Sequence, residues 1–436
     1  MSKKKVFLIV MTGMLVVCLT GLVSVTGLAK TTISIWTAYP EMHEFQKRAG
    51  ERYEKLNPEI DIEATLFPQR ALEEKVAAAL PAGQACDVLD LGTMSTYPYY
   101  VAGLFEEVPA DLVAWLKENF PAAAIKYSTI PGTNKLYTMP NYISLKVMFY
   151  NKDHFKEAGF STTPETIEEQ MMYAEKLVQY DAAGNPTRVG LDLRLSGGGF
   201  GTSQKYWTQV MIPYGTTPIE AVGDKWQAAY DNEWGQKALK YYLDAVYTYK
   251  VESFEVKSDA EGFGLGVTSM FQRESWVIGY LRDNAPEINY GTFLMPKGPR
   301  GWGTVGNMLG ICVPKSSAHK KEAWAFAKWL VNDENMIRMF GESGWQPYRA
   351  NVDYSRLYKE APAIKGFVDA LGTPGHEVID YELISPVFEI HSRLAEQLMI
   401  GFKKPELRDP KKLAAAIHDM AKETNRILDD YDLLAK

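Results

Sequence analysis

Cysteine and histidine are scarce in this chain of 436 residues. It has three cysteines and six histidines, and no C-x-x-C pair or Cys/His spacing typical of a metal site. Cys86 and Cys312 each lie in an apolar run, so two buried free thiols are as well supported as one disulfide. The histidines are scattered, and we expect them at the surface. The sequence therefore predicts neither a bound metal nor a cofactor.

A surplus of positive charge is also missing. Lys and Arg together number 47 and Asp and Glu 54, which gives a net charge of −7 at pH 7. A protein that binds nucleic acid needs the opposite balance, because it must neutralise phosphates. No internal period of 20–50 residues occurs, which excludes a repeat protein. We therefore predict a globular protein without a nucleic-acid partner.

Two enzyme motifs are absent or out of context. Gly301-x-Gly303-x-x-Gly306 has the spacing of a dinucleotide-binding loop, but a Pro-rich segment precedes it and a strand follows it. We interpret it as a glycine-rich loop. Gly341-Glu342-Ser343-Gly344 lacks the spacing of the serine-hydrolase elbow. Neither motif supports catalysis.

The first 29 residues have the pattern of a secretory signal peptide. Three lysines precede an apolar stretch, and small residues lead to Ala29. We predict cleavage after Ala29 and export to the periplasm or the cell exterior. Cys18 offers a lipoprotein alternative, but Val17 is larger than the residue that lipid attachment normally requires. A membrane anchor is a further alternative, because residues 6–29 are long enough to span a bilayer.

Strand and helix patterns alternate after the signal peptide. Residues 32–36, 60–66 and 87–91 read as strands, and residues 42–56 and 72–79 as amphipathic helices. This order predicts a parallel sheet in an α/β domain. Ligands bind beyond the carboxyl ends of such strands. A second unit begins near residue 142, with a helix from Thr162 to about Tyr180.

Several short motifs occur in a fixed order behind the export signal. They are Ile33-Ser34-Ile35-Trp36, Asn57-Pro58-x-Ile60, Cys86-Asp87-Val88-Leu89, Leu136-Tyr137-Thr138-Met139-Pro140, Phe149-Tyr150-Asn151-Lys152, Met270 with Glu274-Ser275-Trp276, Tyr290-Gly291 before Met295-Pro296, residues 314–330 and Gly344-Trp345-Gln346-Pro347-Tyr348-Arg349. In this order they resemble the extracellular solute-binding proteins of bacterial ABC importers, in the carbohydrate-binding family that includes maltose-binding protein. The resemblance covers essentially the whole mature chain. Ile167 and Cys86 depart from the family pattern at positions that do not touch ligand in it.

The resemblance implies an α/β, two-lobed periplasmic binding protein fold of type II. Each lobe would hold a mixed, mostly parallel sheet flanked by helices, and chain crossings between the lobes would form a hinge. The first lobe would comprise residues 30–140 and 296–344, and the second residues 141–295 and 345–436, after the signal peptide at 1–29. Ligand would be enclosed between the lobes and would favour the closed state.

Aromatic residues, 12% of the chain, are abundant enough to serve both a core and a sugar site. Sugars present apolar C–H faces to rings and a rim of hydroxyls to polar side chains. Trp115, Trp324 and Trp329 lie on predicted helices and need no ligand. The resemblance and the strand ends together give these substrate-binding candidates: Trp36, Tyr39, Gln69, Arg70, Asp90, Thr93, Tyr142, Trp207, Glu274, Trp276, Asn307, Trp345 and Arg349.

The resemblance therefore implies non-catalytic capture of a sugar or oligosaccharide and its delivery to ABC permease subunits by a monomer. A secreted glycoside hydrolase is the alternative from another class. The same fold could also bind a sugar phosphate, a polyamine or a peptide. The identity, length and linkage of the sugar are not encoded in any motif of the chain.

Overall fold

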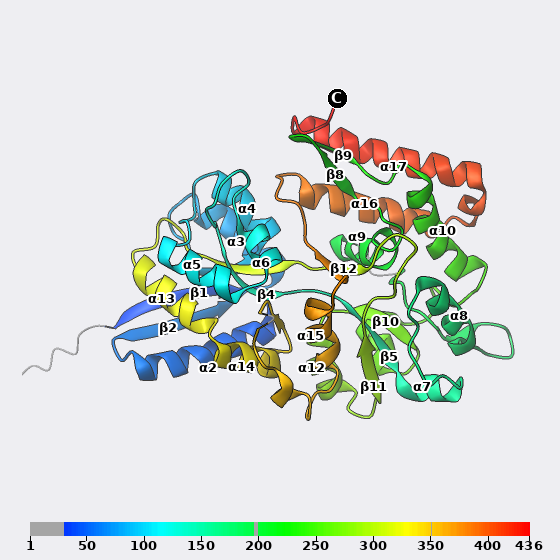
Figure 1. The fold of residues 1–436 in the computed structure, drawn as a ribbon, viewed down its shortest axis with the longest axis horizontal. Coiled ribbons are helices and arrows are strands. Elements are labelled where there is room, and N and C mark those ends of the chain that lie inside the picture. Colours follow the sequence, from blue (N-terminus) through cyan, green and yellow to red (C-terminus); the bar gives the residue numbers. More distant parts are fainter. Residues whose placement is uncertain (1–29, 196–198, 350) are drawn as a thin grey trace, which may run out of the picture.

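The structure is a computed structural model that describes residues 30–195, 199–349 and 351–436. Two groups of helices and strands lie side by side and are joined near strands β4 (Met139–Ile143) and β12 (Gly303–Val305) (Figure 1). The predicted α/β class and two-lobed arrangement are confirmed. The predicted signal peptide and Cys18 lie outside the described residues. Within the described part of the chain, no helix is both long enough and apolar enough to cross a membrane.

A six-stranded sheet forms the centre of the first lobe. Its order is β14-β4-β13-β3-β1-β2, where the further strands are β1 (Thr31–Thr37), β2 (Ile60–Leu66), β3 (Val88–Gly92), β13 (Met308–Cys312) and β14 (Gln346–Pro347). β1 pairs in parallel with both β2 and β3, whereas β13 is antiparallel to its neighbours. Parallel neighbours require crossover connections, and helices α2 (Pro40–Leu56) and α3 (Gln69–Ala79) supply them.

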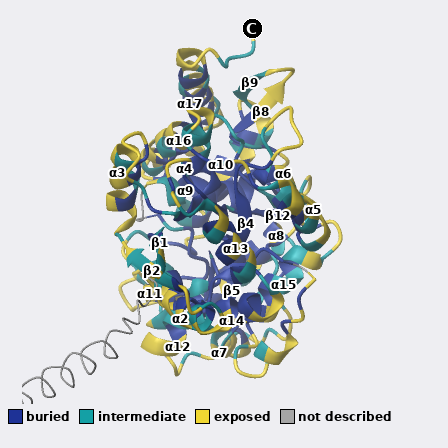
Figure 2. Cartoon of the chain, turned by 90° about the vertical axis from the view of Figure 1, so that its left-hand side faces the viewer, coloured by how far each residue is buried: buried dark blue, intermediate teal, exposed yellow. Residues whose placement is uncertain are grey.

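Amphipathic helices bury one face against this sheet. Met42, Phe45 and Ala49 of α2 are fully buried and pack with Ile33 and Ile35 of β1. The other helices of the lobe are α4 (Thr93–Val101), α5 (Ala110–Asn119), α6 (Ala122–Ser128), α13 (Lys320–Leu330) and α14 (Asp333–Ser343). Figure 2 shows buried strands in the interior and exposed outer faces on helices such as α2 and α3.

The second lobe is built on a three-stranded sheet of order β10-β5-β11, formed by β10 (Met270–Arg273), β5 (Val147–Asn151) and β11 (Tyr290–Phe293). Both pairings are antiparallel, so the expectation of a mostly parallel sheet does not hold here. It does not hold for the six-stranded sheet either, where two pairings are parallel and three are antiparallel. Helix α12 (Trp276–Asn284) carries the chain from β10 to β11, which run in the same direction. β5 inserts between them in the opposite direction, and every bonded pair is therefore antiparallel.

Helices make up most of the second lobe. They are α7 (Lys152–Glu157), α8 (Ile167–Leu177), α9 (Phe200–Tyr206), the π-helix Trp207–Met211, α10 (Glu233–Tyr247), α11 (Asp259–Gly264), α15 (Ile364–Gly372), α16 (Val387–Gly401) and α17 (Pro410–Asp430), with 3-10 turns at Ser355–Leu357 and Pro405–Arg408. Two hairpins, β6 (Gln179–Tyr180) with β7 (Pro186–Arg188) and β8 (Ile219–Val222) with β9 (Lys225–Ala228), lie at its periphery.

The chain passes between the two sheets at three places. Residues 144–146 join β4 to β5, residues 294–302 lead from β11 to β12, and the chain leaves the first sheet again after β14. β4 and β14 thus extend the first sheet a few residues past the expected limits at 140 and 344. β12 pairs in parallel with β15 (Glu377–Ile379) beside these crossings.

Candidate functional site

A pocket of about 340 Å³ opens where the two lobes face each other, at the carboxyl ends of β1 and β3. We call it the cleft pocket. The first lobe contributes Tyr39, Gln69, Glu73, Gly92, Met94, Ser95 and Asn307, the first crossing contributes Ser144, and the second lobe contributes Phe200, Gln204 and Phe388. Helix α4 contacts helix α16 beside it, and Met94 packs into the apolar core of the second lobe. The pocket is therefore bounded by both lobes.

Three aromatic side chains meet beside this pocket, and we call them the aromatic cluster. The ring centroid of Tyr39 lies 5.0 Å from that of Trp345 and 6.3 Å from that of Tyr142, and Tyr142 lies 5.5 Å from Trp345. Tyr142 is fully buried, and its hydroxyl donates to the Asp90 carboxylate at 3.2 Å. The indole N–H of Trp345 is buried without an acceptor among the described residues. A ligand oxygen could supply that acceptor.

Asp90 is hydrogen-bonded to the aromatic cluster through Tyr142. Its Oδ2 accepts hydrogen bonds from Thr37, Gln46 and Tyr142, while its Oδ1 has no partner among the described residues. Burial raises the pKa of Asp90 to about 7, although the three donors oppose this shift. Thr93 is equally buried, and its carbonyl accepts from the Tyr137 hydroxyl. Both candidates are buried and do not line the cleft pocket, whereas their neighbours Gly92 and Met94 do.

A buried ion-pair group lies on the side of the second lobe. Glu274 lies 3.1 Å from Lys146 and 2.8 Å from Arg273, and it accepts from the indole N–H of Trp276 at 3.3 Å. Burial alone would raise the pKa of Glu274, but the charges of Arg273 and Lys146 outweigh burial and hold it below its usual range. Burial lowers the pKa of Lys146 to about 8 despite the neighbouring Glu274. The Glu274 carboxylate therefore stays ionised and orients Trp276.

Trp276 begins helix α12 and is half-buried. The Arg273 guanidinium lies over its ring, 5.0 Å from the centroid. Gly344 caps α14 in the left-handed conformation, and a Cβ at that position would lie 3.4 Å from the Cα of Trp276. Trp276 and Trp345 therefore flank the point where the two lobes touch.

A second group of rings consists of residues that were not among the sequence candidates. Phe200 and Phe388 stack with centroids 5.3 Å apart and an interplanar angle of 8°, and both line the cleft pocket. Phe388 is 48% exposed, which is unusual for so large an apolar side chain. They are 188 positions apart, so no local motif joins them. The run of glycines before Phe200 is the only sequence signal near either residue.

Trp207 lies behind this pair and is buried. Its ring packs against Tyr381 and His391, with centroids 5.6 and 5.4 Å away, and its N–H has no acceptor among the described residues. His391 shares a 2.8 Å hydrogen bond with Ser203, and burial lowers its pKa to about 3. The expectation that histidines lie at the surface is wrong for His391 and for the buried His376.

Of the thirteen candidates, Tyr39, Gln69 and Asn307 line the cleft pocket and the other ten do not. Three of those ten, Trp36, Arg70 and Arg349, take their partners from other parts of the structure. Trp36 packs against Phe67 and Lys75, because alternation along β1 directs it to the face opposite Ile35 and Thr37. The Arg70 side chain is 91% exposed and pairs with Glu74.

Arg349 is the third of these candidates and is buried away from the pocket. It donates to the Val331 carbonyl, pairs with Asp333 at 2.8 Å and lies over the rings of Trp115 and Phe120. It stabilises the first lobe at its core. Of the other candidates, Gln69 lines the pocket and bonds to Glu73, and Asn307 lines it with a buried Oδ1 that lacks a donor among the described residues.

Cys86 and Cys312 do not form a disulfide with each other. Cys86 and Cys312 are both free and buried. Burial raises the pKa of Cys86 well above its ordinary value and that of Cys312 to about 11. No group of His, Cys, Asp or Glu in the described residues has the arrangement of a metal site.

Comparisons with known proteins agree with this geometry. The family model of the bacterial extracellular solute-binding proteins matches residues 48–366. The multiple sugar-binding protein of Streptococcus mutans is 24% identical over 329 residues, which cover 72% of this chain and 74% of the relative.

Solved structures show the same fold. An ABC transporter solute-binding protein of Thermotoga lettingae bound to α-D-tagatose has a TM-score of 0.73 and 21% identity, covering 92% of this chain and all of that one. Maltose-bound MalE3 of T. maritima has a TM-score of 0.73 and 17% identity, covering 91% and 100%. The two-lobed type II fold and the resemblance stated above are confirmed. The chain belongs to the family of bacterial extracellular solute-binding proteins.

Proposed function

We propose that this protein captures a neutral sugar or oligosaccharide in the cleft pocket and delivers it to the permease of an ABC importer. The observation that carries the proposal is the lining of the cleft pocket, which combines aromatic side chains from both lobes with polar groups that are neutral except for the Glu73 carboxylate. Tyr39 and the stacked pair Phe200–Phe388 supply the rings, and Ser144, Gln204 and Asn307 supply neutral hydrogen-bonding groups. Rings fit the apolar faces of a sugar, and amides and hydroxyls fit its rim.

Charge pairing supports a neutral ligand over a charged one. Lys146 and Arg273 pair with Glu274, and Lys205 and Arg194 lie 3.8 and 3.6 Å from Asp259. A sugar phosphate requires a cation that is free to bind it. Each of these cations already has a carboxylate within reach, so the buried charges favour a neutral ligand. Relatives whose names refer to sugars support the same ligand class.

A glycoside hydrolase needs two carboxyl groups that can reach a glycosidic bond. Asp90 is buried and accepts three hydrogen bonds, and Glu274 is held between two cations. These contacts favour binding without turnover, in line with a family of solute-binding proteins. Chromatography of oligosaccharides incubated with the protein would show cleavage products if the hydrolase alternative were correct.

The lobes and the crossings support closure by a hinge. We assign the six-stranded sheet to one moving body and the three-stranded sheet with α15 to α17 to the other, with ligand contacts on both favouring the closed state. The signal-peptide pattern supports export as a cleaved, monomeric periplasmic or extracellular protein, in preference to lipid attachment at Cys18.

A thermal-shift screen against a carbohydrate panel tests the proposal. A ligand present at about 100 times its dissociation constant adds about 2.7 kcal/mol of stability. The stabilising sugar should lose affinity in Phe388→Ala and keep it in Tyr431→Ala, because Tyr431 is similarly exposed but does not line the cleft pocket. If no sugar stabilises the protein while a phosphorylated sugar, polyamine or peptide does, the proposal is overturned.

A further inference from the structure

A second pocket, of about 370 Å³, lies apart from the cleft pocket, between α12, α14 and the segment that leads into α15. We call it the α12–α14 pocket. α14 contributes Phe340 and Gly341 from the first lobe, whereas Ile278 of α12 and Tyr290 of β11 come from the second. It shares no lining residue with the cleft pocket.

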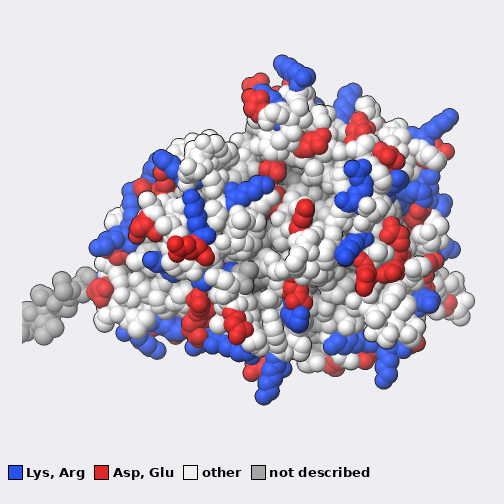
Figure 3. Space-filling model, in the orientation of Figure 1, with Lys and Arg blue, Asp and Glu red and all other residues white. Residues whose placement is uncertain are grey.

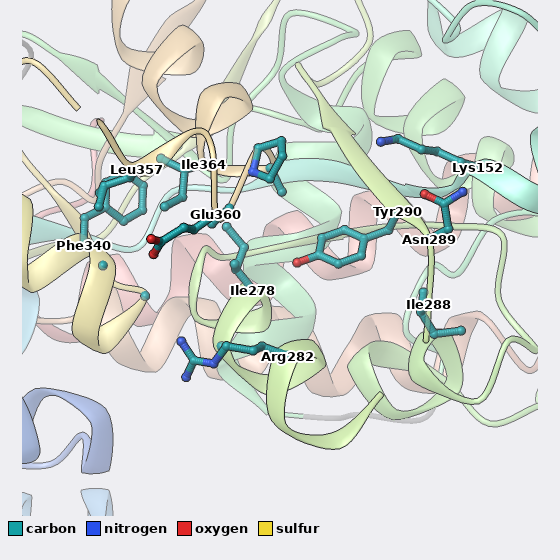
Figure 4. Close-up of a pocket in the computed structure, with 16 residues that line it drawn as sticks. Lys152, Ile278, Arg282, Ile288, Asn289, Tyr290, Phe340, Leu357, Glu360 and Ile364 are labelled. Atoms are coloured by element: carbon teal, nitrogen blue, oxygen red, sulfur yellow. The ribbon is translucent and has the colours of Figure 1, made fainter. Parts of the chain in front are cut away.

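Apolar side chains form most of its wall. Ile278, Phe340, Leu357 and Ile364 surround the space in Figure 4. Gly279 of α12 leaves part of this wall open. A Cβ at that position would meet only the tip of Arg282, at 3.8 Å. The pocket therefore has room for a compact apolar group next to α12.

Five polar side chains line the same space: Lys152, Arg282, Asn289, Tyr290 and Glu360. The Tyr290 hydroxyl points into the pocket toward the side that holds Glu360 and Arg282 (Figure 4). Burial raises the pKa of Tyr290 to about 12, and the charge of Arg282 opposes this shift. No described group forms a hydrogen bond with the Tyr290 hydroxyl.

Arg282 and Glu360 carry opposite charges at this end of the pocket, and they do not form an ion pair with each other. Arg282 pairs with the exposed Asp283 at 2.8 Å, and both side chains are 62% exposed, so solvent screens that pair. Glu360 forms no ion pair with any described residue. An anionic group and a cationic group on one ligand would each find a partner here, with an apolar body between the walls.

We propose that the α12–α14 pocket binds a free α-amino acid with an apolar side chain. The α-carboxylate binds Arg282 and the Tyr290 hydroxyl, the α-ammonium binds Glu360, and the side chain packs against Ile278 and Phe340. This site shares no lining residue with the cleft pocket and does not rest on the proposed transport function.

Isothermal titration with L-phenylalanine and L-leucine tests the proposal on the full mature chain. Two truncated probes, 3-phenylpropionate and phenethylamine, lack the ammonium and the carboxylate respectively. Both amino acids should bind with dissociation constants on the order of 1 mM or below. Each truncated probe should bind at least tenfold more weakly. Equal binding by 3-phenylpropionate would show a plain anion site and overturn the proposal, as would no heat from either amino acid.

Variants test whether L-phenylalanine binds in the α12–α14 pocket. Glu360→Gln and Arg282→Gln should each weaken L-phenylalanine binding at least tenfold, and Gly279→Leu should abolish it by filling the pocket. Gly279→Ala, which adds one methyl group, serves as the matched folding control and should retain binding. Phe388→Ala alters the cleft pocket only and should leave the amino-acid affinity unchanged. Loss in Phe388→Ala with retention in Glu360→Gln would place the amino acid in the cleft and overturn the assignment.

Discussion

At the scale of single residues, Trp276 joins the ion-pair group to the place where the lobes meet. Its N–H is held by Glu274 and one side of its ring by Arg273. Fixed rings of this kind lose little conformational entropy when a ligand stacks on them. The orientation of Trp276 is therefore set before ligand arrives.

We expect Trp276→Ala to weaken sugar binding by roughly 2 kcal/mol, as loss of a buried aromatic anchor does. Neither tryptophan lines the cleft pocket, but Trp276 lies where the two lobes touch, whereas Trp329 packs against Tyr53 and Phe326 inside the first lobe. Trp329→Ala is therefore the matched control. Fluorescence titration of both variants measures the effect. Equal affinity of Trp276→Ala and the unaltered protein would remove Trp276 from the site.

Asp90 gives a second prediction, in the pH dependence of stability. Its folded pKa, about 7, lies above the ordinary 3.8, so the unfolded chain ionises first and stability falls as pH rises from about 4 to 7. Asp90→Asn keeps the acceptor for Thr37, Gln46 and Tyr142 and removes the charge. Relative to the unaltered protein, this variant should gain roughly 2 kcal/mol between pH 5 and pH 8.

Urea unfolding of Asp90→Asn at the two pH values measures this gain. The exposed Asp111→Asn controls for loss of a surface charge. A constant difference between Asp90→Asn and the unaltered protein at pH 5 and pH 8 would show that Asp90 does not titrate in this range.

From the sequence alone, a residue that follows a parallel strand can be placed at the cleft. Cleft residues from other parts of the chain cannot be identified in this way. Tyr39 follows β1, and its place at the cleft follows from the rule on carboxyl ends. Trp36 lies on the same strand, but its orientation depends on which face of β1 meets α3. Phe200 and Phe388 could not be found, because their stacking depends on the packing of α9 against α16. Contacts across 188 positions leave no local pattern.

At the scale of elements, the pairing of the three consecutive strands of the first sheet was predictable, and the pairing of the strands that join it from later in the chain, like that of the whole second sheet, was not. β1, β2 and β3 follow one another with a helix between, so their pairing is local in sequence. β5 pairs with β10 and β11, which lie more than 100 positions further along the chain. Helix α8 also begins later than predicted, because Thr166 provides the cap by accepting from the Glu169 N–H at 3.1 Å.

The packing of α15 on β11 gives a prediction about two glycines of one helix. A Cβ at Gly366 would lie 2.4 Å from the Thr292 Oγ1 and 2.9 Å from its Cβ, whereas a Cβ at Gly372 would meet nothing within 4 Å. We expect Gly366→Ala to destabilise the protein by about 1–3 kcal/mol through overpacking.

Gly372→Ala should leave stability unchanged or raise it by a few tenths of a kcal/mol, since alanine is the better helix former. Urea unfolding of both variants gives the comparison. Equal destabilisation of the two would show that the effect belongs to the helix and not to its contact with β11.

At the scale of the whole molecule, the net charge of −7 is small for a chain of 436 residues. Figure 3 shows acidic and basic side chains interspersed over the face seen in Figure 1, without a continuous basic surface. This distribution gives no long-range field of one sign to steer a charged ligand on this face.

Sugar affinity should therefore be nearly independent of salt. We expect less than a twofold change in the dissociation constant between about 50 mM and 500 mM NaCl, a range over which interactions between exposed charges are strongly screened. Titrations at both concentrations measure it. A tenfold weakening in high salt would indicate a charged ligand and would contradict the neutral-sugar proposal.

The two buried thiols have a consequence for how the chain matures. Folding needs no oxidant, because neither Cys86 nor Cys312 forms a disulfide. In the native state, their burial and raised pKa values keep them in the unreactive thiol form. In an unfolded chain exported to an oxidising compartment the same thiols are exposed and ionise more readily. Oxidation of Cys86 and Cys312 to a non-native disulfide would therefore compete with folding of the first lobe.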